Sequence, residues 1–275
     1  MKRLLYFLCL LAGVMLACNI PSTTTPTVLT PPPVAITETP VGVTPAVQAN
    51  VTCNNVSLYL DPALASGFQC QTVAEVSGAD YPGFAVNPQY TEITFQGYVL
   101  ADRFFTPHVD VYPVQRFTEI APDVNIPSRV SALQALIGGG TPGSDALPLL
   151  PVFNAAQEFY AHYQVLPFGT GSGIRFLTQY SQFADPVNNH EMFYSYQGLT
   201  ADGVYWISAI LPVSLAGLPD NGDNPPDGQT FEQFSNNFPA YIADMTSKLN
   251  GQADGDFSPT LPALDKLVAS LQVTP

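Results

Sequence analysis

The sequence predicts an α+β fold in which a central antiparallel sheet is packed by helices. Period-two alternation of apolar side chains recurs through the middle of the chain, and this pattern is typical of strands. The apolar residues near the C-terminal end follow helical spacing instead. An Asp202-Gly203 pair joins two strand-like segments closely enough to form a hairpin turn, and such hairpins join antiparallel strands. Residues 51–275 contain no internal repeat or second linker, so we expect a single α+β globular domain.

The predicted strands share alternating or continuous apolar character. In chain order they are residues 54–60, 91–100, 109–117, 158–165, 173–183, 191–197 and 204–213. Within 158–165 the alternation places Phe159, Ala161, Tyr163 and Val165 on one face. Residues 204–211 are apolar on both faces, which is typical of a central strand covered on both sides. We expect the C-terminal part of the chain to supply that cover.

Three predicted helices complete the domain. Residues 127–137 have a proline in the first turn, an apolar stripe and Gly138 after the last turn. Residues 231–249 carry a second stripe, although Pro239 is expected to kink or split it. Residues 262–271 form the last helix. Its predicted buried residues are Leu264, Leu267, Val268 and Leu271.

The N-terminal residues have the pattern of an export signal. Lys2 and Arg3 precede an uncharged apolar run over residues 4–16, which is shorter than the roughly 20 residues that span a bilayer. The run ends in Met15-Leu16-Ala17-Cys18, which resembles the lipobox of bacterial lipoprotein signals. This resemblance implies that residues 1–17 are a signal peptide and that Cys18 carries diacylglycerol and palmitate. The alternatives are an uncleaved signal anchor, or cleavage near Ala17 that leaves Cys18 free.

Residues 18–50 follow the lipobox as a linker rich in Thr and Pro, including Pro31-Pro32-Pro33. Such a segment cannot bury enough apolar surface to fold, so we expect it to be disordered. Its prolines favour polyproline II, about 3.1 Å per residue, which gives a tether that holds a domain away from the membrane surface. The expected location is therefore the extracytoplasmic face of the cell membrane, through the lipid anchor at Cys18.

Cys53 and Cys70 remain once Cys9 and Cys18 are assigned to the signal and the lipid. Two thiols near one another in an exported chain are usually oxidised, so we predict a Cys53–Cys70 disulfide. A metal site is the alternative, but two cysteines with no nearby histidine are a poor zinc set.

The charge balance excludes one class of partner. The chain has 8 Lys and Arg against 22 Asp and Glu, and a formal net charge of −14. We therefore expect no nucleic-acid binding and no binding of the domain to anionic headgroups. An acidic surface suits solubility, or cations and cationic partners.

No segment has a catalytic or cofactor signature, so we predict no catalytic, cofactor-binding or metal residues. The glycine-rich residues 169–173 have the wrong spacing for a phosphate loop and precede a strand. His190-Glu191 lacks the second histidine of a zinc-protease helix, and a site built from His108, His162 and His190 is a remote alternative. Residues 220–228 have acidic and amide oxygens of the kind calcium prefers, without the EF-hand pattern, so a solvated loop is favoured.

Glu158, His162 and Arg175 lie on neighbouring predicted strands and could meet in space. They could form an active site, but we favour a satisfied cluster of ion pairs.

Two segments carry a family resemblance. Residues 111–114 and the run from Glu191 to Val213 resemble a family of uncharacterised bacterial lipoproteins that have a Thr/Pro stalk and an α+β domain. The family has no assigned activity. A weaker architectural resemblance is to the PsbP-like fold, because a sheet is closed by a last helix ending in Ser270 to Val273. That fold implies binding and assembly rather than catalysis.

These observations leave a lipid-anchored surface protein whose molecular function the sequence does not name. The first hypothesis is a non-catalytic module that binds an extracytoplasmic protein or a small ligand. The second is an extracytoplasmic hydrolase with an unrecognised active site, and the third is a purely structural envelope protein. The character of the largest cleft should separate the first two, because an enzyme needs a desolvated acid or base there.

Overall fold

The computed structural model describes residues 48–143 and 146–274. The predicted signal peptide, Cys18 and almost all of the predicted linker lie outside the described residues. Among the helices that are described, none has the length and apolarity needed to cross a membrane.

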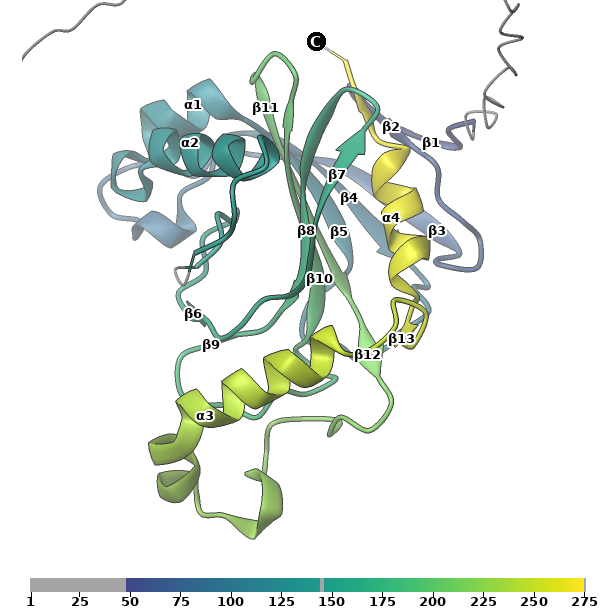
Figure 1. Ribbon diagram of the computed structural model, residues 1–275. Coiled ribbons are helices and arrows are strands. Elements are labelled where there is room, and N and C mark those ends of the chain that lie inside the picture. The colour runs from purple at the N-terminus through teal and green to yellow at the C-terminus, as the bar shows by residue number, and fades with distance from the viewer. Residues whose placement is uncertain (1–47, 144–145, 275) are drawn as a thin grey trace, which may run out of the picture. The chain divides into compact units, whose positions relative to one another are not determined.

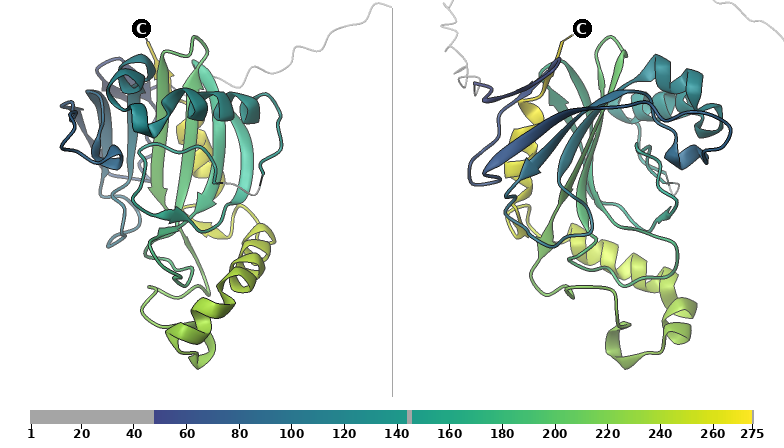
Figure 2. Two further views of the ribbon diagram at one scale, coloured as in Figure 1. Left: turned by 90° about the vertical axis from the view of Figure 1, so that its left-hand side faces the viewer. Right: turned by 180° about the vertical axis from the view of Figure 1, so that it is seen from behind.

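An antiparallel sheet of seven strands organises the domain, which confirms the α+β prediction. In spatial order the strands are β3 (Gly67–Val73), β4 (Tyr90–Gln96), β5 (His108–Pro113), β11 (Tyr205–Pro212), β10 (Phe193–Thr200), β8 (Gly171–Thr178) and β7 (Ala161–Phe168). Helices and a small sheet lie on its two faces, so the domain has three layers (Figures 1 and 2).

The central position of β11 agrees with its apolar sequence. The strand is fourth of the seven, and every residue from Trp206 to Pro212 is buried. Trp206 and Ile210 point to one core cluster, while Ile207 and its period-two neighbours point to the other. The turn at Asp202-Gly203 joins β10 to β11 as predicted, and Gly203 has φ +73°, which favours glycine.

Two helices and residues 147–150 cover one face of the sheet. The helices are α1 (Val114–Ile120) and α2 (Ile126–Ile137), and α2 has Pro127 in its first turn as predicted. The expectation that the C-terminal part covers both faces is therefore wrong, because the middle of the chain covers this one. The predicted strand 109–117 is also wrong beyond Pro113, where the backbone turns into α1 and buries Phe117 on this face.

The opposite face is covered by α4 (Leu261–Ala269) and by a small sheet. That sheet contains β1 (Val51–Cys53), β2 (Val56–Leu58) and β14 (Gln272–Val273). The four residues predicted to be buried in the last helix are at most 2% exposed. Burying a leucine fully contributes about 1.5–3 kcal/mol, so α4 holds this layer firmly. Leu271 lies just after the helix rather than in it.

The predicted disulfide is present. Cys53 in β1 bonds to Cys70 in β3, with the two Cα atoms 5.5 Å apart. It connects the small sheet to the edge of the large one. Strand β3 itself was not predicted, because five of its seven residues are exposed and its apolar pattern is weak.

A β-bulge in β7 overturns the prediction that Phe159, Ala161, Tyr163 and Val165 share one face of the sheet. The register against β8 shifts between Ala161 and Gln164, and His162 has φ +51°. Phe159 and Ala161 pack in the core beneath α4, whereas Tyr163 and Val165 pack on the α2 face. A bulge reverses the faces of the residues that follow it, so simple alternation fails here.

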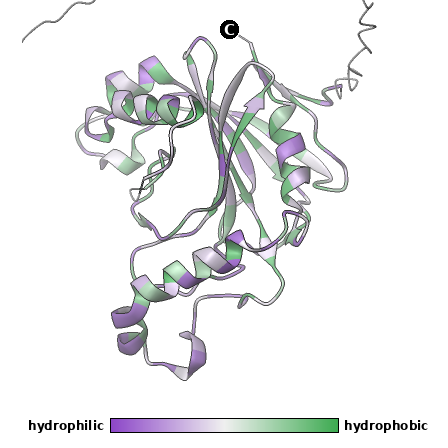
Figure 3. Ribbon diagram, in the orientation of Figure 1, coloured by the Kyte–Doolittle hydropathy of each residue, from purple (hydrophilic) through white to green (hydrophobic). Residues whose placement is uncertain are grey.

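Helix α3 (Phe231–Asn250) continues through Pro239 without being split, and its direction changes in its first half (Figure 1). Only Phe234 and Leu249 are buried in its twenty residues. Its first turns and the preceding loop are hydrophilic (Figure 3). The helix contacts the sheet through β7, and most of its other side chains, with those of the preceding loop, are at least partly exposed to solvent.

The remaining elements are short. They are η1 (Gly83–Ala85), η2 (Pro122–Val124), η3 (Pro226–Gly228), the pair β6 (Ala156–Gln157) and β9 (Tyr180–Ser181), and the pair β12 (Ser214–Leu215) and β13 (Phe257–Ser258).

Candidate functional site

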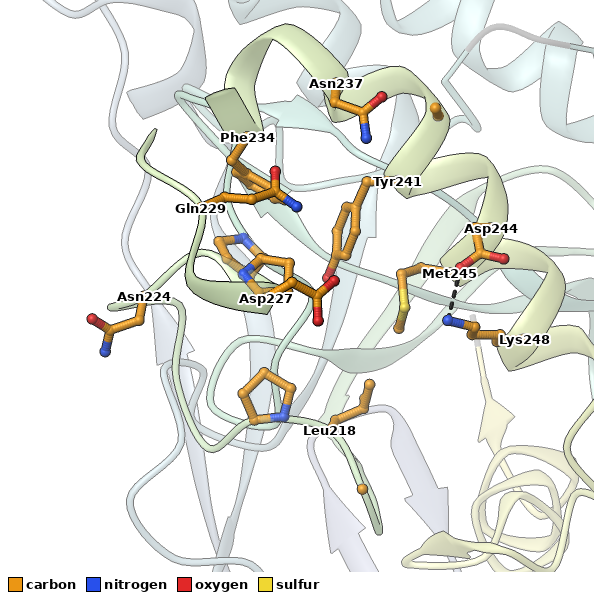
Figure 4. A pocket seen from close by; sticks show the side chains of 15 residues that line it. Leu218, Asn224, Asp227, Gln229, Phe234, Asn237, Tyr241, Asp244, Met245 and Lys248 are labelled. Atoms are coloured by element: carbon orange, nitrogen blue, oxygen red, sulfur yellow. Dashed lines mark ion pairs between the residues drawn. The ribbon is translucent and has the colours of Figure 1, made fainter. Parts of the chain in front are cut away.

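The main candidate site is a cleft of about 660 Å³ between α3 and the loop of residues 217–229. Figure 4 shows side chains from both segments lining it. Phe234, Tyr241, Met245 and Leu218 provide apolar surface, while amides and charged groups lie among them. The polar side chains are Asn224, Asp227, Gln229, Asn237, Asp244 and Lys248. The cleft falls in the size range of small-ligand pockets.

One face of α3 forms a side of this cleft, as the helical spacing of its lining residues shows. Phe234, Asn237, Tyr241, Met245 and Lys248 are three or four residues apart, so they lie along one face. The helix begins at a capping box, in which Thr230 and Gln233 each hydrogen-bond the other's backbone N–H. At its other end, Asn250 Oδ1 accepts a hydrogen bond from the backbone N–H of His162 at 2.8 Å.

The charged groups of the cleft pair with each other in solvent. Lys248 Nζ lies 2.7 Å from Asp244 Oδ2, and both side chains are more than half exposed. Tyr241 accepts a hydrogen bond from the backbone N–H of Val187 at 2.9 Å, which ties α3 to the segment before β10. Among the described residues that line the cleft there is no histidine, and its two carboxylates, Asp227 and Asp244, are exposed to solvent.

A second pocket of about 510 Å³ lies nearby, and its polar lining is mainly acidic. Asp185, Glu191 and Asp223 line it together with His190, Asn221 and Gly222. Burial, and then the adjacent carboxyl of Glu191, raise the pKa of Asp185 to about 7. Glu158, which is a neighbour of this group, has both carboxyl oxygens buried, and its nearest donors are the backbone N–H of Asp185 and the side chain of Gln179. Burial and the charge of Asp185 raise the pKa of Glu158 to about 8.

A third group of polar side chains is buried beneath α4. Arg175 in β8 is 3% exposed, and its Nη2 donates to Gln164 Oε1 and to Asp254 Oδ2, each at 2.8 Å. His162 Nδ1 lies 2.9 Å from Asp254 Oδ1. Asp265 in α4 accepts a hydrogen bond from the Tyr194 hydroxyl at 2.9 Å, and its Oδ1 lies 3.7 Å from Arg175 Nε. Burial raises the pKa of Asp265, and it raises the pKa of Tyr194 further because that side chain is fully buried.

The structure therefore brings together two of the three residues that were predicted to meet. His162 and Arg175 converge on Asp254 and form an ion-pair cluster, but the cluster is not fully satisfied as we expected, because Nε and Nη1 of Arg175 are buried without a hydrogen-bond partner. Glu158 does not join them, since its carboxyl group lies beside Asp185 instead. The bulge explains the split, because His162 lies in it and contacts Leu249 and Asp254 at and after the end of α3, while Glu158 lies before it.

The other sequence candidates do not form a metal centre. In residues 48–143 and 146–274 no group of three or more His, Cys, Asp or Glu side chains is arranged to hold a metal ion. The three histidines have separate surroundings: His108 approaches Asp110, His162 approaches Asp254, and His190 bonds the carbonyl of Asp102. His190 and Glu191 lie in a turn before β10 rather than in a strand.

Two predicted loops have structural roles. Gly169 and Thr170 form the tight turn between β7 and β8, and Gly171 and Gly173 belong to β8. A Cβ at Gly173 would collide with the backbone of β10, which explains that glycine. Residues 220–228 form the outer wall between the two pockets, so part of the predicted solvated loop lines both.

Sequence reasoning missed Asp185, Tyr241, Asp254 and Asp265. Tyr241, Asp254 and Asp265 act through partners distant along the chain, such as Asp254 with Arg175, which are 79 residues apart. Asp185 has a nearer neighbour in Glu191, but the pair matches no known motif. No local motif marks them. Comparison of the chain with protein-family models, with curated proteins and with solved structures gives no match.

Proposed function

We propose that this protein is a non-catalytic binding module, presented outside the cell membrane on a lipid-anchored linker that begins at Cys18. The observation that carries the proposal is the cleft along α3. Its lining mixes aromatic, aliphatic and amide groups, while its one ion pair is exposed to solvent and it contains no desolvated acid or base.

The location of the cleft supports this role. The described chain begins next to β1, at the end of the sheet opposite α3 and the loop of residues 217–229 (Figures 1 and 2). A linker that joins the domain near β1 would leave the cleft uncovered and open to extracytoplasmic ligands or proteins. The resemblance to stalked lipoproteins and to the PsbP-like fold is compatible with binding and remains part of the proposal.

Site-specific photo-crosslinking in intact cells tests the module. A photoreactive residue at Asn237, in the cleft, should capture a defined ligand or protein, whereas one at Ser131, exposed on α2, should not. Captured material should be displaced by an excess of the unlabelled chain and not by its Met245→Glu variant, which places a charge in the cleft. Equal capture at Asn237 and Ser131 would contradict the proposal.

Lipid attachment has its own test. A clickable fatty acid should label the wild-type chain in cells, and Cys18→Ala should abolish both the label and membrane retention. Label that persists in Cys18→Ala would place the attachment elsewhere.

An extracytoplasmic hydrolase remains the second candidate because of one observation. The carboxyl groups of Asp185 and Glu191 are hydrogen-bonding neighbours in an open pocket, and two carboxyls that share a proton can serve acid–base chemistry. Glu191→Gln should then abolish turnover of chromogenic ester or glycoside substrates by the wild-type protein. Absence of turnover by the wild type across these substrates would count against this candidate.

A further inference from the structure

The pocket of about 510 Å³ that contains Asp185 has an excess of acidic groups. Three carboxyl groups line it, and Glu158 lies behind them. In the described part of the chain, no Lys or Arg forms an ion pair with Asp185, Glu191 or Asp223. Asp185 is buried, Glu191 is half-buried and Asp223 is exposed. Crowding other carboxyl groups around a buried one, without a cation, carries an electrostatic cost that a bound cation would relieve.

Asp185 is the unusual member of this group. It is only 5% exposed, yet it lines the pocket. The pKa of its carboxyl is raised first by burial, then by the acid Glu191 and by the charge of Asp223. Among the described residues, no basic group lowers this pKa. The backbone of Gly222 lies directly on its carboxyl, where a Cβ would collide with Oδ1. Asp185 is thus a largely buried acid in the wall of a pocket, and its hydrogen-bonding neighbour among the described side chains is another acid, Glu191.

The rim of the pocket is aromatic. Phe183 is 68% exposed and Phe231 is 52% exposed, and both line the pocket. Phe104, which is also exposed, packs edge-on against the ring of His190 with centroids 6.2 Å apart. Exposed large apolar side chains gathered at one site mark a binding surface more often than chance exposure. Aromatic faces beside carboxylates are the groups that bind organic cations.

From this combination we propose that the pocket binds an organic cation, an ammonium or guanidinium group, with Asp185 and Glu191 as its counter-charges and Phe183 and Phe231 against its apolar part. The site is distinct from the cleft along α3 and lies on the other side of the loop of residues 217–229. The volume is far larger than one metal ion requires, and no metal-holding group occurs among the described residues. The cation can come from a free small molecule or from a Lys or Arg side chain of a partner.

Titration calorimetry on the purified full-length chain in detergent tests the proposal, with choline, a short lysine peptide and a short arginine peptide as probes. At least one should bind saturably at about pH 8, and Asp185→Asn should weaken it by about tenfold or more, which corresponds to about 1.4 kcal/mol. Phe183→Leu should weaken choline by a few-fold, because it removes the aromatic face. Choline alone binding would indicate a small-molecule ligand, and peptide alone binding would indicate a partner side chain.

Asp123→Asn is the matched control. It removes the same charge from an exposed position in η2, so it reports any effect of net charge alone. Asp185→Asn replaces a buried acid by a neutral isostere, and its unfolding curve will show that the fold is retained. Equal weakening by the two variants, calcium binding tighter than every organic cation, or no saturable binding would each overturn the proposal. A loss of cleft binding in Met245→Glu with cation binding intact would separate the two sites.

Discussion

Two clusters of polar side chains in this domain differ in whether their carboxyl groups are paired with a cation. Beneath α4, the charge of Arg175 meets the carboxylates of Asp254 and Asp265. Beside the loop of residues 217–229, Asp185 meets other acids, and no cation of the described chain pairs with it. The comparison teaches that the first cluster is complete in charge, because its carboxylates have a cation within the fold, although Nε and Nη1 of Arg175 are buried without a hydrogen-bond partner. Among the described residues the second cluster has no such cation, so it gains stability only from protons or from a bound cation.

The largest expected effect comes from breaking the complete cluster. Arg175→Met should destabilise the protein by about 1.5–3 kcal/mol, because it removes the hydrogen bonds of a buried guanidinium and leaves the half-buried carboxylates of Asp254 and Asp265 without a cation. Urea unfolding at neutral pH measures the loss. Arg116→Met is the control, since Arg116 pairs with Glu75 and Glu119 at the surface, and it should leave the unfolding midpoint almost unchanged. Equal loss in both variants would show that burial does not distinguish the two arginines.

The incomplete cluster should respond to pH. Burial and then Glu191 raise the pKa of Asp185 to about 7, and burial and then the charge of Asp185 raise the pKa of Glu158 to about 8. The folded state therefore holds protons that the unfolded state has already released, and stability falls as pH rises from about 4 to above 8. We expect the free energy of unfolding to be lower at about pH 9 than at about pH 5.

The double variant Glu158→Gln with Asp185→Asn should flatten this dependence, and unfolding at the two pH values would show it. An equal pH dependence in the double variant would mean that other groups cause it. A bound organic cation should act in the opposite direction to protons, so its affinity should rise as pH increases through about 7.

The smallest effect concerns a single hydroxyl of the complete cluster. Tyr194→Phe removes the hydrogen bond to Asp265, which should cost about 1 kcal/mol and raise the pKa of Asp265 further. Tyr241→Phe removes the corresponding contact to Val187 near the incomplete cluster. Thermal unfolding of both variants compares them, and a neutral Tyr194→Phe would show that Asp265 is held by Arg175 alone.

Much of the fold follows from local patterns. Residues 204–211 are apolar on both faces, and they form the central strand β11. Helices α2 and α4 and the disulfide between Cys53 and Cys70 were predictable for similar reasons, because each depends on spacing within a short stretch or on a simple pairing. Strand β3 and helix α1 were not, since one is an exposed edge and the other continues an alternating strand.

The sites were far less predictable than the elements. The pattern of residues indicated that His162 and Arg175 could meet, but it could not place Asp254 between them. It also grouped Glu158 with them, although the bulge at His162 directs the two side chains to different clusters.

By itself, the sequence determined that the domain is α+β, which strand is central and which cysteines pair, because burial and periodicity are written into neighbouring residues. Only the tertiary structure decided which charges have partners. Whether a buried acid meets an arginine or another acid depends on contacts between distant segments, and such contacts leave no local pattern in the chain.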